Sequence, residues 1–264
     1  YLNNDMAILL YIIVLTCLSI YSYALVDPNL TLINSDIWVT FRNVMVQLGY
    51  YERNASWTYY LLIICTLYLF HGYFIKKIHK YNPIHIAGLV SMILLLSYPF
   101  LSRDFFNYIF DAKIITYYHE NPYLKSALDF QTGSWLRFMH WTHRTYPYGP
   151  SWLLITLLPS LLSFGKFILN FIFFKLLFML SYLATTYVLN KINKKNALFF
   201  ASNPFVIMEG LVNAHNDFIA LSFGIIGISL LLNKKNITYI KTSYGKISTW
   251  ALLVISALIK YITT

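Results

Sequence analysis

The chain alternates between long apolar runs and short polar connections. A transmembrane helix needs about 20 apolar residues, within a range of about 17–25. Seven runs approach or reach that length, so the pattern predicts an all-α, multi-span transmembrane helical bundle that forms one domain over residues 1–264. The runs are 6–26, 58–75, 84–101, 167–190, 197–212, 218–232 and 248–262. An eighth run, 151–164, has only about 14 residues and contains Pro159, which favours a re-entrant or interfacial helix over a crossing.

Composition supports an integral membrane protein. Of the 264 residues, 58% are hydrophobic and 11% are charged, whereas a soluble domain carries about 25% charged residues. The net charge of +10 comes from lysines in short loops, so no nucleic-acid partner is predicted. Cys17 and Cys65 both lie in apolar runs, which excludes a disulfide framework. The chain opens on Tyr1 and ends inside an apolar run, so we expect a piece of a longer protein.

Lysines indicate how the bundle is oriented. Three clusters follow apolar runs, namely Lys76, Lys77 and Lys80, then Lys191, Lys194 and Lys195, then Lys234 and Lys235. All three fall on one side if 151–164 does not cross, and lysine-rich loops mark the cytoplasmic side. The loop 102–150 and the turn 213–217 then lie outside. We therefore predict a multi-pass protein of the cell membrane with its site on the extracytoplasmic side.

The stretch that follows the third run carries the first candidate chemistry. Asp104, Tyr108 and Asp111 stand at i, i+4 and i+7, which places them on one face of a helix predicted over 104–118. The opposite face is apolar, so this helix is predicted to lie along the membrane surface with its polar face in water, as external juxtamembrane helices do. The alternative is that Asp104 only caps the N-terminus of the helix. An amphipathic piece at Ile37–Leu48 is predicted to form another surface helix.

A second polar cluster lies about a hundred residues later. Asn203 and Pro204 break one run, Glu209 stands near its end, and His215-Asn216-Asp217 opens the next run. Ionisable groups at membrane depth cost at least ~2.5 kcal/mol and usually serve a site. Lys260, within the last apolar run, extends the cluster. The alternatives are an N-cap role for Asp217 and a snorkelling side chain for Lys260.

No recognised metal or nucleotide motif is present. Four side chains of the external loop could approach a metal, but their spacing matches no known pattern, so no metal site is predicted and a divalent cation stays open as a cofactor. They are His119, Glu120, His140 and His143. The phosphate-binding and nucleophile motifs of nucleotide-binding proteins and hydrolases are absent from the sequence.

The order of short motifs resembles a known family. The motifs are Arg103-Asp104 with Tyr108, Asn121-Pro122-Tyr123, Tyr148-Gly149-Pro150 with Trp152, Asn203-Pro204 with Glu209, His215-Asn216-Asp217, and Ile259-Lys260-Tyr261. Over residues 100–262 the chain resembles the polyprenol-phosphate-mannose-dependent mannosyltransferases of the GT-C superfamily. Enzymes of this family usually continue well past the length seen here.

The resemblance implies a membrane glycosyltransferase. It implies a polyprenyl-phosphate-linked sugar donor within the membrane and a glycan or glycolipid acceptor outside. Asp104 would be the general base, His215, Asn216 and Asp217 would line the same external cavity, and Lys260 would face the donor phosphate. Arg103, Tyr108, Asp111, Tyr148 and Glu209 complete the predicted substrate-binding set.

Physical chemistry is consistent with a single carboxylate at such a site. Polyprenyl phosphate leaves without a proton, so one base that accepts the acceptor hydroxyl proton is enough, and a single displacement inverts the sugar. The rival interpretations are a polytopic transporter or flippase for a lipid-linked saccharide, which would show repeats and broken helices at mid-membrane, and a non-catalytic membrane scaffold.

Overall fold

The fold is all-α, as predicted. The computed structural model describes residues 3–130, 135–232 and 243–260, and within these ranges every regular element is a helix. The longer helices are α1 (Asn4–Tyr21), α2 (Asp36–Val46), α3 (Arg53–Lys76), α4 (Pro83–Leu94), α5 (Asp104–Thr116), α6 (Pro150–Leu162), α7 (Phe167–Ile192), α8 (Lys194–Ser202), α10 (Asn216–Leu232) and α12 (Ser243–Ile259). The short ones are η1 (Ser22–Leu25), η2 (Gln47–Tyr51), η3 (Ile78–Lys80), η4 (Ala127–Phe130), η5 (Leu136–Phe138), α9 (Pro204–Val206) and η6 (Ile207–Val212).

Three helical stretches of the described chain are long and apolar enough to cross a membrane. They are Asn4–Leu25, Arg53–Lys76 and Phe167–Ile192. A fourth crossing is available if Pro204–Val212 and Asn216–Leu231, which meet at a 117° bend, count as one broken span. The apolar helices α4 and α6 are shorter, as is the part of α12 from Ile247 to Ile259. The chain is thus a helical membrane protein with fewer full-length helices than the apolar runs suggest.

The helix within the predicted run 84–101 ends early. It stops at Leu94, and the chain continues without regular structure to Asp104. Side chains satisfy this irregular backbone at membrane depth, as they must where water is excluded. The Tyr23 hydroxyl donates to the Leu96 carbonyl (2.5 Å), and the Tyr98 N–H donates to Ser22 Oγ (2.8 Å). The predicted run 197–212 is likewise divided, at Asn203, between α8 and the α9–η6 unit.

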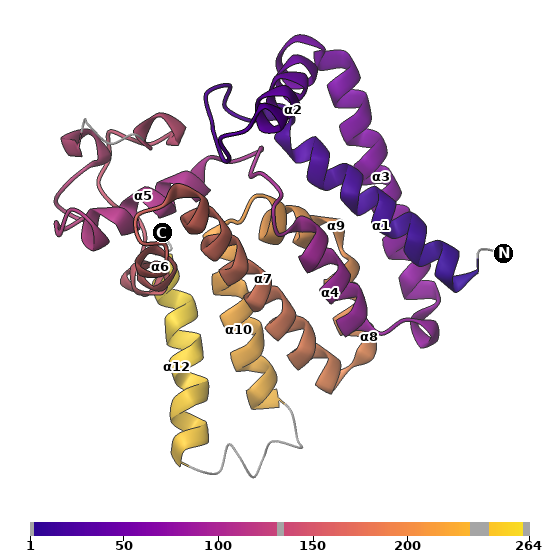
Figure 1. Cartoon of the computed structure of the whole chain (residues 1–264). Coiled ribbons are helices and arrows are strands. Elements are labelled where there is room, and N and C mark those ends of the chain that lie inside the picture. Colours follow the sequence, from indigo (N-terminus) through magenta and orange to yellow (C-terminus); the bar gives the residue numbers. More distant parts are fainter. Residues whose placement is uncertain (1–2, 131–134, 233–242, 261–264) are drawn as a thin grey trace.

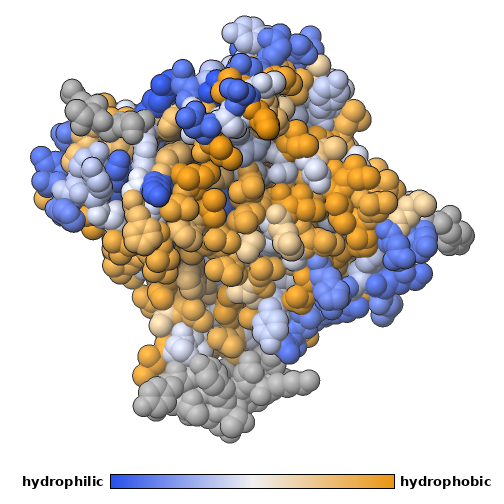
Figure 2. All heavy atoms as spheres, in the orientation of Figure 1, coloured by the Kyte–Doolittle hydropathy of each residue, from blue (hydrophilic) through white to orange (hydrophobic). Residues whose placement is uncertain are grey.

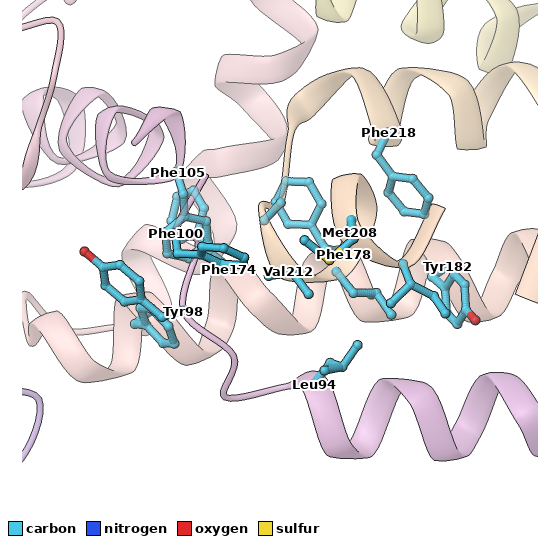
Figure 3. Packing of buried hydrophobic residues seen from close by; sticks show 14 of the residues in the cluster. Leu94, Tyr98, Phe100, Phe105, Phe174, Phe178, Tyr182, Met208, Val212 and Phe218 are labelled. Carbon is cyan, nitrogen blue, oxygen red and sulfur yellow. The ribbon is translucent and has the colours of Figure 1, made fainter. Parts of the chain in front are cut away.

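Helix α7 forms the centre of the packing. Its buried aromatic residues Phe174, Phe178 and Tyr182 belong to one cluster with Leu94 of α4 and with residues of α5, η6 and α10 (Figure 3). Phe105, the second residue of α5, meets Phe174 edge to face with ring centroids 6.1 Å apart. In Figure 1, α5 lies across the upper ends of α7 and α10, which run downward from it. The first turn of α5 is therefore anchored in the main core.

The surface shows the banding of a membrane protein. On the face seen in Figure 2, a broad hydrophobic band separates a hydrophilic zone at the top, near α5, from another at the lower right. Lys194 Nζ donates to the His79 carbonyl (3.5 Å), which brings two of the three lysine clusters together at the end of the bundle away from α5. The third cluster, Lys234 and Lys235, lies outside the described residues.

The predicted surface helix at Ile37–Leu48 is confirmed as α2. The Ser35 hydroxyl caps its N-terminus by accepting the Trp38 N–H (3.2 Å). Trp38 is buried against Tyr23, with ring centroids 5.8 Å apart, while Ile37 is 83% exposed. The helix therefore packs on the bundle through one face.

Candidate functional site

The helix predicted over 104–118 is confirmed as α5, but its predicted setting is wrong. All ten residues from Phe105 to Ile114 are buried. Tyr108 is 1% exposed and Asp111 is 8% exposed, so the polar face does not lie open to water. The loop 102–150 covers it, because Asn107 Nδ2 donates to the Trp141 carbonyl (3.2 Å) and Asn107 Oδ1 accepts the His140 N–H (3.3 Å).

Asp104 does not cap α5. It is the first residue of the helix, the N-cap position is Arg103, and no side chain makes a capping hydrogen bond there. The Asp104 N–H donates to Ser102 Oγ (3.2 Å). The capping interpretation is therefore wrong. Across the described chain, no side chain or backbone group makes a hydrogen bond or ion pair with the Asp104 carboxylate.

Asp104 lines a pocket of about 490 Å³. The pocket lies between the first turn of α5, the segment that precedes it, and the part of the loop 102–150 that holds His140 and Trp141. Its lining residues are Leu25, Tyr50, Phe100, Leu101, Ser102, Arg103, Asp104, His140 and Trp141. Arg103 also makes no hydrogen bond or ion pair with any described residue. A carboxylate and a guanidinium thus stand side by side in one pocket, both available to a ligand.

The turn 213–217, called the histidine turn below, lies beside this pocket. The Leu101 N–H donates to Asn213 Oδ1 (3.3 Å). The Tyr108 hydroxyl donates to Asn216 Oδ1 (3.2 Å) and accepts the Asn216 N–H (3.3 Å). Ala214, at the centre of the turn, has a φ of 55°, in the left-handed region that residues with a Cβ rarely adopt. These bonds join two parts of the chain that are more than a hundred residues apart in sequence.

Glu209 and His215 are paired with each other. His215 Nδ1 lies 2.8 Å from Glu209 Oε2, and both side chains are about a third exposed. Asn213 Nδ2 also donates to Glu209 Oε1 (3.4 Å). The second ring nitrogen of the histidine, Nε2, is buried and has no hydrogen-bond partner among the described residues. Glu209 therefore orients the ring, and Nε2 is the ring nitrogen that remains available to a ligand.

Asp217 and Lys260 form the second pair. Lys260 Nζ lies 2.8 Å from Asp217 Oδ2. The Lys260 side chain is 49% exposed, and it follows Ile259, where α12 ends, so its predicted place within the last apolar run is wrong. Asp217 lies inside the first turn of α10, which begins at Asn216, so the capping interpretation is wrong for this residue too. The charge of Lys260 is already balanced by a carboxylate in this structure.

Gly149 brings Tyr148 close to the end of α12. The Gly149 N–H donates to the Ile259 carbonyl (3.0 Å), and a Cβ on this glycine would lie 1.9 Å from the Leu258 carbonyl oxygen. Any larger residue would force the two segments apart. Tyr148 itself is buried, and its ring meets that of Tyr108 edge to face at 5.2 Å. Burial raises the pKa of both hydroxyl groups above the ordinary tyrosine value.

Asp111 lies in a different environment from Asp104. Burial raises the pKa of its carboxyl to about 8, Arg144 opposes that rise and Asp104 adds to it. Asp111 is not among the residues that line the Asp104 pocket. Near neutral pH it is therefore mostly a neutral acid that can donate a hydrogen bond.

The histidines of the loop 102–150 do not converge on a metal site. Among the described residues, no group of three or more histidine, cysteine, aspartate or glutamate side chains could hold a metal ion. His140 instead lines the Asp104 pocket.

Two features of the site were missing from the sequence interpretation. His140 and Trp141 line the pocket, and Asn107 holds them there, but nothing in the sequence signals that long-range pairing. Lys175 of α7 is 2% exposed, and its Nζ donates to the Leu211 carbonyl, the Val212 carbonyl (3.1 Å) and Ser97 Oγ (3.0 Å). It thereby fixes η6, which leads to the histidine turn. A lone lysine inside the apolar run 167–190 was a signal that could have revealed it.

Comparison with known proteins identifies the family. No curated protein and no solved structure matches this chain significantly. Residues 14–264, which are nearly the whole chain, match the model of a family described as "Alpha-(1->6)-mannopyranosyltransferase, N-terminal domain". The chain therefore belongs to this family of mannosyltransferases, and it is a membrane glycosyltransferase that transfers mannose.

Proposed function

We propose that this enzyme takes mannose from a polyprenyl-phosphate donor and transfers it to a hydroxyl group of an extracytoplasmic glycan or glycolipid. Asp104 acts as the general base. One observation carries the proposal: the Asp104 carboxylate lines a pocket of about 490 Å³ and has no partner among the described residues. Membership of the GT-C superfamily is part of the same proposal.

The chemistry needs one base and one good leaving group. The acceptor oxygen attacks C1 of the mannose, and the bond from C1 to the phosphate oxygen breaks. The polyprenyl phosphate leaves with the bonding electron pair, and the Asp104 carboxylate accepts the hydroxyl proton. Attack opposite the leaving group inverts the configuration at C1. A positioned base typically contributes 10²–10⁴-fold to such a step.

Arg103 is the first candidate to bind the donor phosphate. It lines the pocket beside Asp104 and has no ion-pair partner in the described part of the chain. A cation at this position stabilises the charge that develops on the departing phosphate. Lys260 was expected to do so, but it is paired with Asp217, so it reaches a phosphate only when that exposed pair opens. His215 Nε2 is a further group that could contact substrate.

The orientation of the bundle supports an extracytoplasmic site. Lysine loops gather on the cytoplasmic side of membrane proteins. The loops around Lys76–Lys80 and Lys191–Lys195 meet at one end of the bundle, and α5 lies at the other end (Figure 1). Nucleotide sugars are confined to the cytoplasm, so a donor used at the α5 end has to be carried by a lipid.

The test is a comparison of donors. Full-length protein is reconstituted in liposomes with a glycan acceptor and is supplied with either polyprenyl-phosphate mannose or a nucleotide-activated mannose, each radiolabelled. We expect label in the glycan only with the lipid donor. Transfer from the nucleotide donor alone would overturn the donor assignment.

A further inference from the structure

A second polar pocket lies at the other end of α5. Its volume is about 160 Å³, and it is enclosed by α5, the turn after α6 and the first turns of α7. Its lining residues are Lys113, Thr116, Tyr117, Trp135, Ser160, Leu161, Ser163, Phe164, Gly165 and Asn170. None of them lines the Asp104 pocket. At 3.6 residues per turn, Lys113 lies half a turn from Asp104 around the helix and roughly 14 Å along it, so the two sites are separate.

Lys113 brings a positive charge into this pocket. The residue is 8% exposed. Its Nζ lies 3.9 Å from the centroid of the Trp135 ring and 5.0 Å from that of Tyr117, so aromatic faces surround it. Over the described ranges it has no carboxylate within ion-pair distance and no hydrogen-bond acceptor. Burial lowers the pKa of the Lys113 ammonium, and an anion beside it would restore the charged form.

Asn170 brings an unfilled acceptor into the same pocket. It is 1% exposed, and its Nδ2 donates to Ser163 Oγ (2.6 Å), while its Oδ1 is buried with no hydrogen-bond partner in the part of the chain that the structure describes. The neighbouring hydroxyl protons are committed elsewhere. Thr116 donates to the Ala112 carbonyl and Ser163 donates to the Ser160 carbonyl, so the Ser160 hydroxyl is left to donate to Thr116 Oγ1 (2.8 Å). A ligand that satisfies this pocket must therefore supply a negatively charged oxygen for Lys113 and a hydrogen-bond donor for Asn170.

The pocket adjoins an exposed apolar surface. Leu161 and Phe164 both line it, and they are 58% and 82% exposed. Phe164 and Gly165 have φ values of 50° and 72°, so the turn holds a large aromatic side chain outward in a left-handed backbone conformation. In a membrane protein, such apolar side chains at the end of a helix meet lipid. A ligand with a polar head and hydrocarbon chains fits both parts of this region.

We propose that this pocket binds the headgroup of an anionic phospholipid whose headgroup also carries a hydroxyl group, as in a glycerol phosphate headgroup. The phosphate accepts from Lys113 Nζ, the hydroxyl group donates to Asn170 Oδ1, and the acyl chains lie along Leu161 and Phe164. The volume corresponds to roughly five water molecules at about 30 Å³ each, which suits a small headgroup. The proposal requires only that the chain lies in a membrane and is independent of the proposed transfer reaction.

The test measures thermal stabilisation by short-chain lipids. Full-length protein in a neutral detergent is titrated with phosphatidylglycerol, with phosphatidylcholine of the same chain length, or with inorganic phosphate. We expect phosphatidylglycerol to raise the melting temperature with saturation and the other two to raise it far less. Equal shifts with both lipids would overturn the proposal. An equal shift with inorganic phosphate would show that the pocket binds a soluble anion rather than a lipid, which would also overturn the proposal.

Variants locate the effect. Lys113→Met keeps an unbranched side chain that is one atom shorter and removes its charge, and we expect at least tenfold weaker phosphatidylglycerol binding. Lys166→Met is the matched control, because Lys166 is exposed, adjoins the same turn and does not line the pocket. Wild-type binding in Lys113→Met, or equal weakening in both variants, would contradict the assignment. If Lys113→Met does not fold, Asn170→Asp places a carboxylate beside Lys113 and is expected to abolish binding, and wild-type binding in that variant would contradict the assignment as well.

Discussion

Two aspartates on one face of α5 have opposite environments. Asp104 stands at the start of the helix, lines an open pocket and has no partner among the described residues. Asp111 lies two turns later, is 8% exposed, and has its pKa raised to about 8 by burial. Tyr108 lies between them on the same face and joins α5 to Asn216 of the histidine turn. The difference teaches that helical spacing places two acids on one face, whereas the surrounding fold decides which one can accept a proton.

The largest expected effect is on the rate of mannose transfer when the Asp104 carboxylate is removed. Asp104→Asn removes the proposed base while it keeps the shape of the side chain, so mannose transfer should fall by about 10²–10⁴-fold. The same substitution at the exposed Asp129, in the loop that follows α5, is the control and should leave transfer unchanged. The measurement is the rate of label transfer from polyprenyl-phosphate mannose at matched expression. Normal transfer by Asp104→Asn would remove the base assignment.

The next effect concerns Lys175, which holds η6 just before the turn that contacts Tyr108 of α5. Lys175→Met leaves the Leu211 and Val212 carbonyls without their ammonium donor, and each buried acceptor that loses its partner costs about 1–3 kcal/mol. We expect a clear fall in melting temperature in detergent. Lys166→Met makes the same change at an exposed position and should have little effect. Equal stability of the two variants would show that these bonds do not support the turn.

The third effect concerns Asp111 and is a pH dependence of the protein's stability. The pKa of Asp111 is higher in the folded chain than the unfolded value of about 3.9, so the folded state binds more protons between about pH 4 and pH 8. Stability therefore falls as the pH rises through this window, by at most about 1.4 kcal/mol per pH unit. Asp111→Asn should flatten the melting-temperature profile, whereas Asp129→Asn should not. An unchanged dependence of melting temperature on pH in Asp111→Asn would show that Asp111 does not bind the proton responsible.

The smallest stability effect is expected at the exposed pair of Lys260 with Asp217. Lys260→Met should cost less than about 1 kcal/mol, because exposed ion pairs contribute little. If Lys260 also contacts the donor phosphate, the KM for the lipid donor should rise more than the KM for the acceptor. Steady-state kinetics with each substrate varied in turn measures this, and an equal rise in both values would exclude a role specific to the phosphate.

The sequence was informative where the pattern is local. The apolar runs predicted the helical class, the 3.6-residue period predicted α5 and α2, and Asn203-Pro204 predicted the break before η6. Each of these features depends on residues that are neighbours in the chain, so a short window contains the necessary information.

Long-range contacts account for what the sequence did not predict. The apolar pattern continues past Leu94, but α4 stops there, and contacts from Ser22, Tyr23 and Lys175 bind the irregular segment that follows. In the same way, Asn107 holds His140 and Trp141 over α5, which closes one part of its polar face and shapes the pocket at its start. No local pattern encodes partners that lie tens of residues away.

The most direct test of the account compares the two aspartates in one assay. Asp104→Asn and Asp111→Asn are reconstituted side by side at pH 7, and the rate of mannose transfer from polyprenyl-phosphate mannose is measured for each relative to wild type. The account predicts that Asp104→Asn loses at least tenfold more activity than Asp111→Asn, a difference of about 1.4 kcal/mol or more in transition-state stabilisation. Equal losses, or a larger loss in Asp111→Asn, would contradict it.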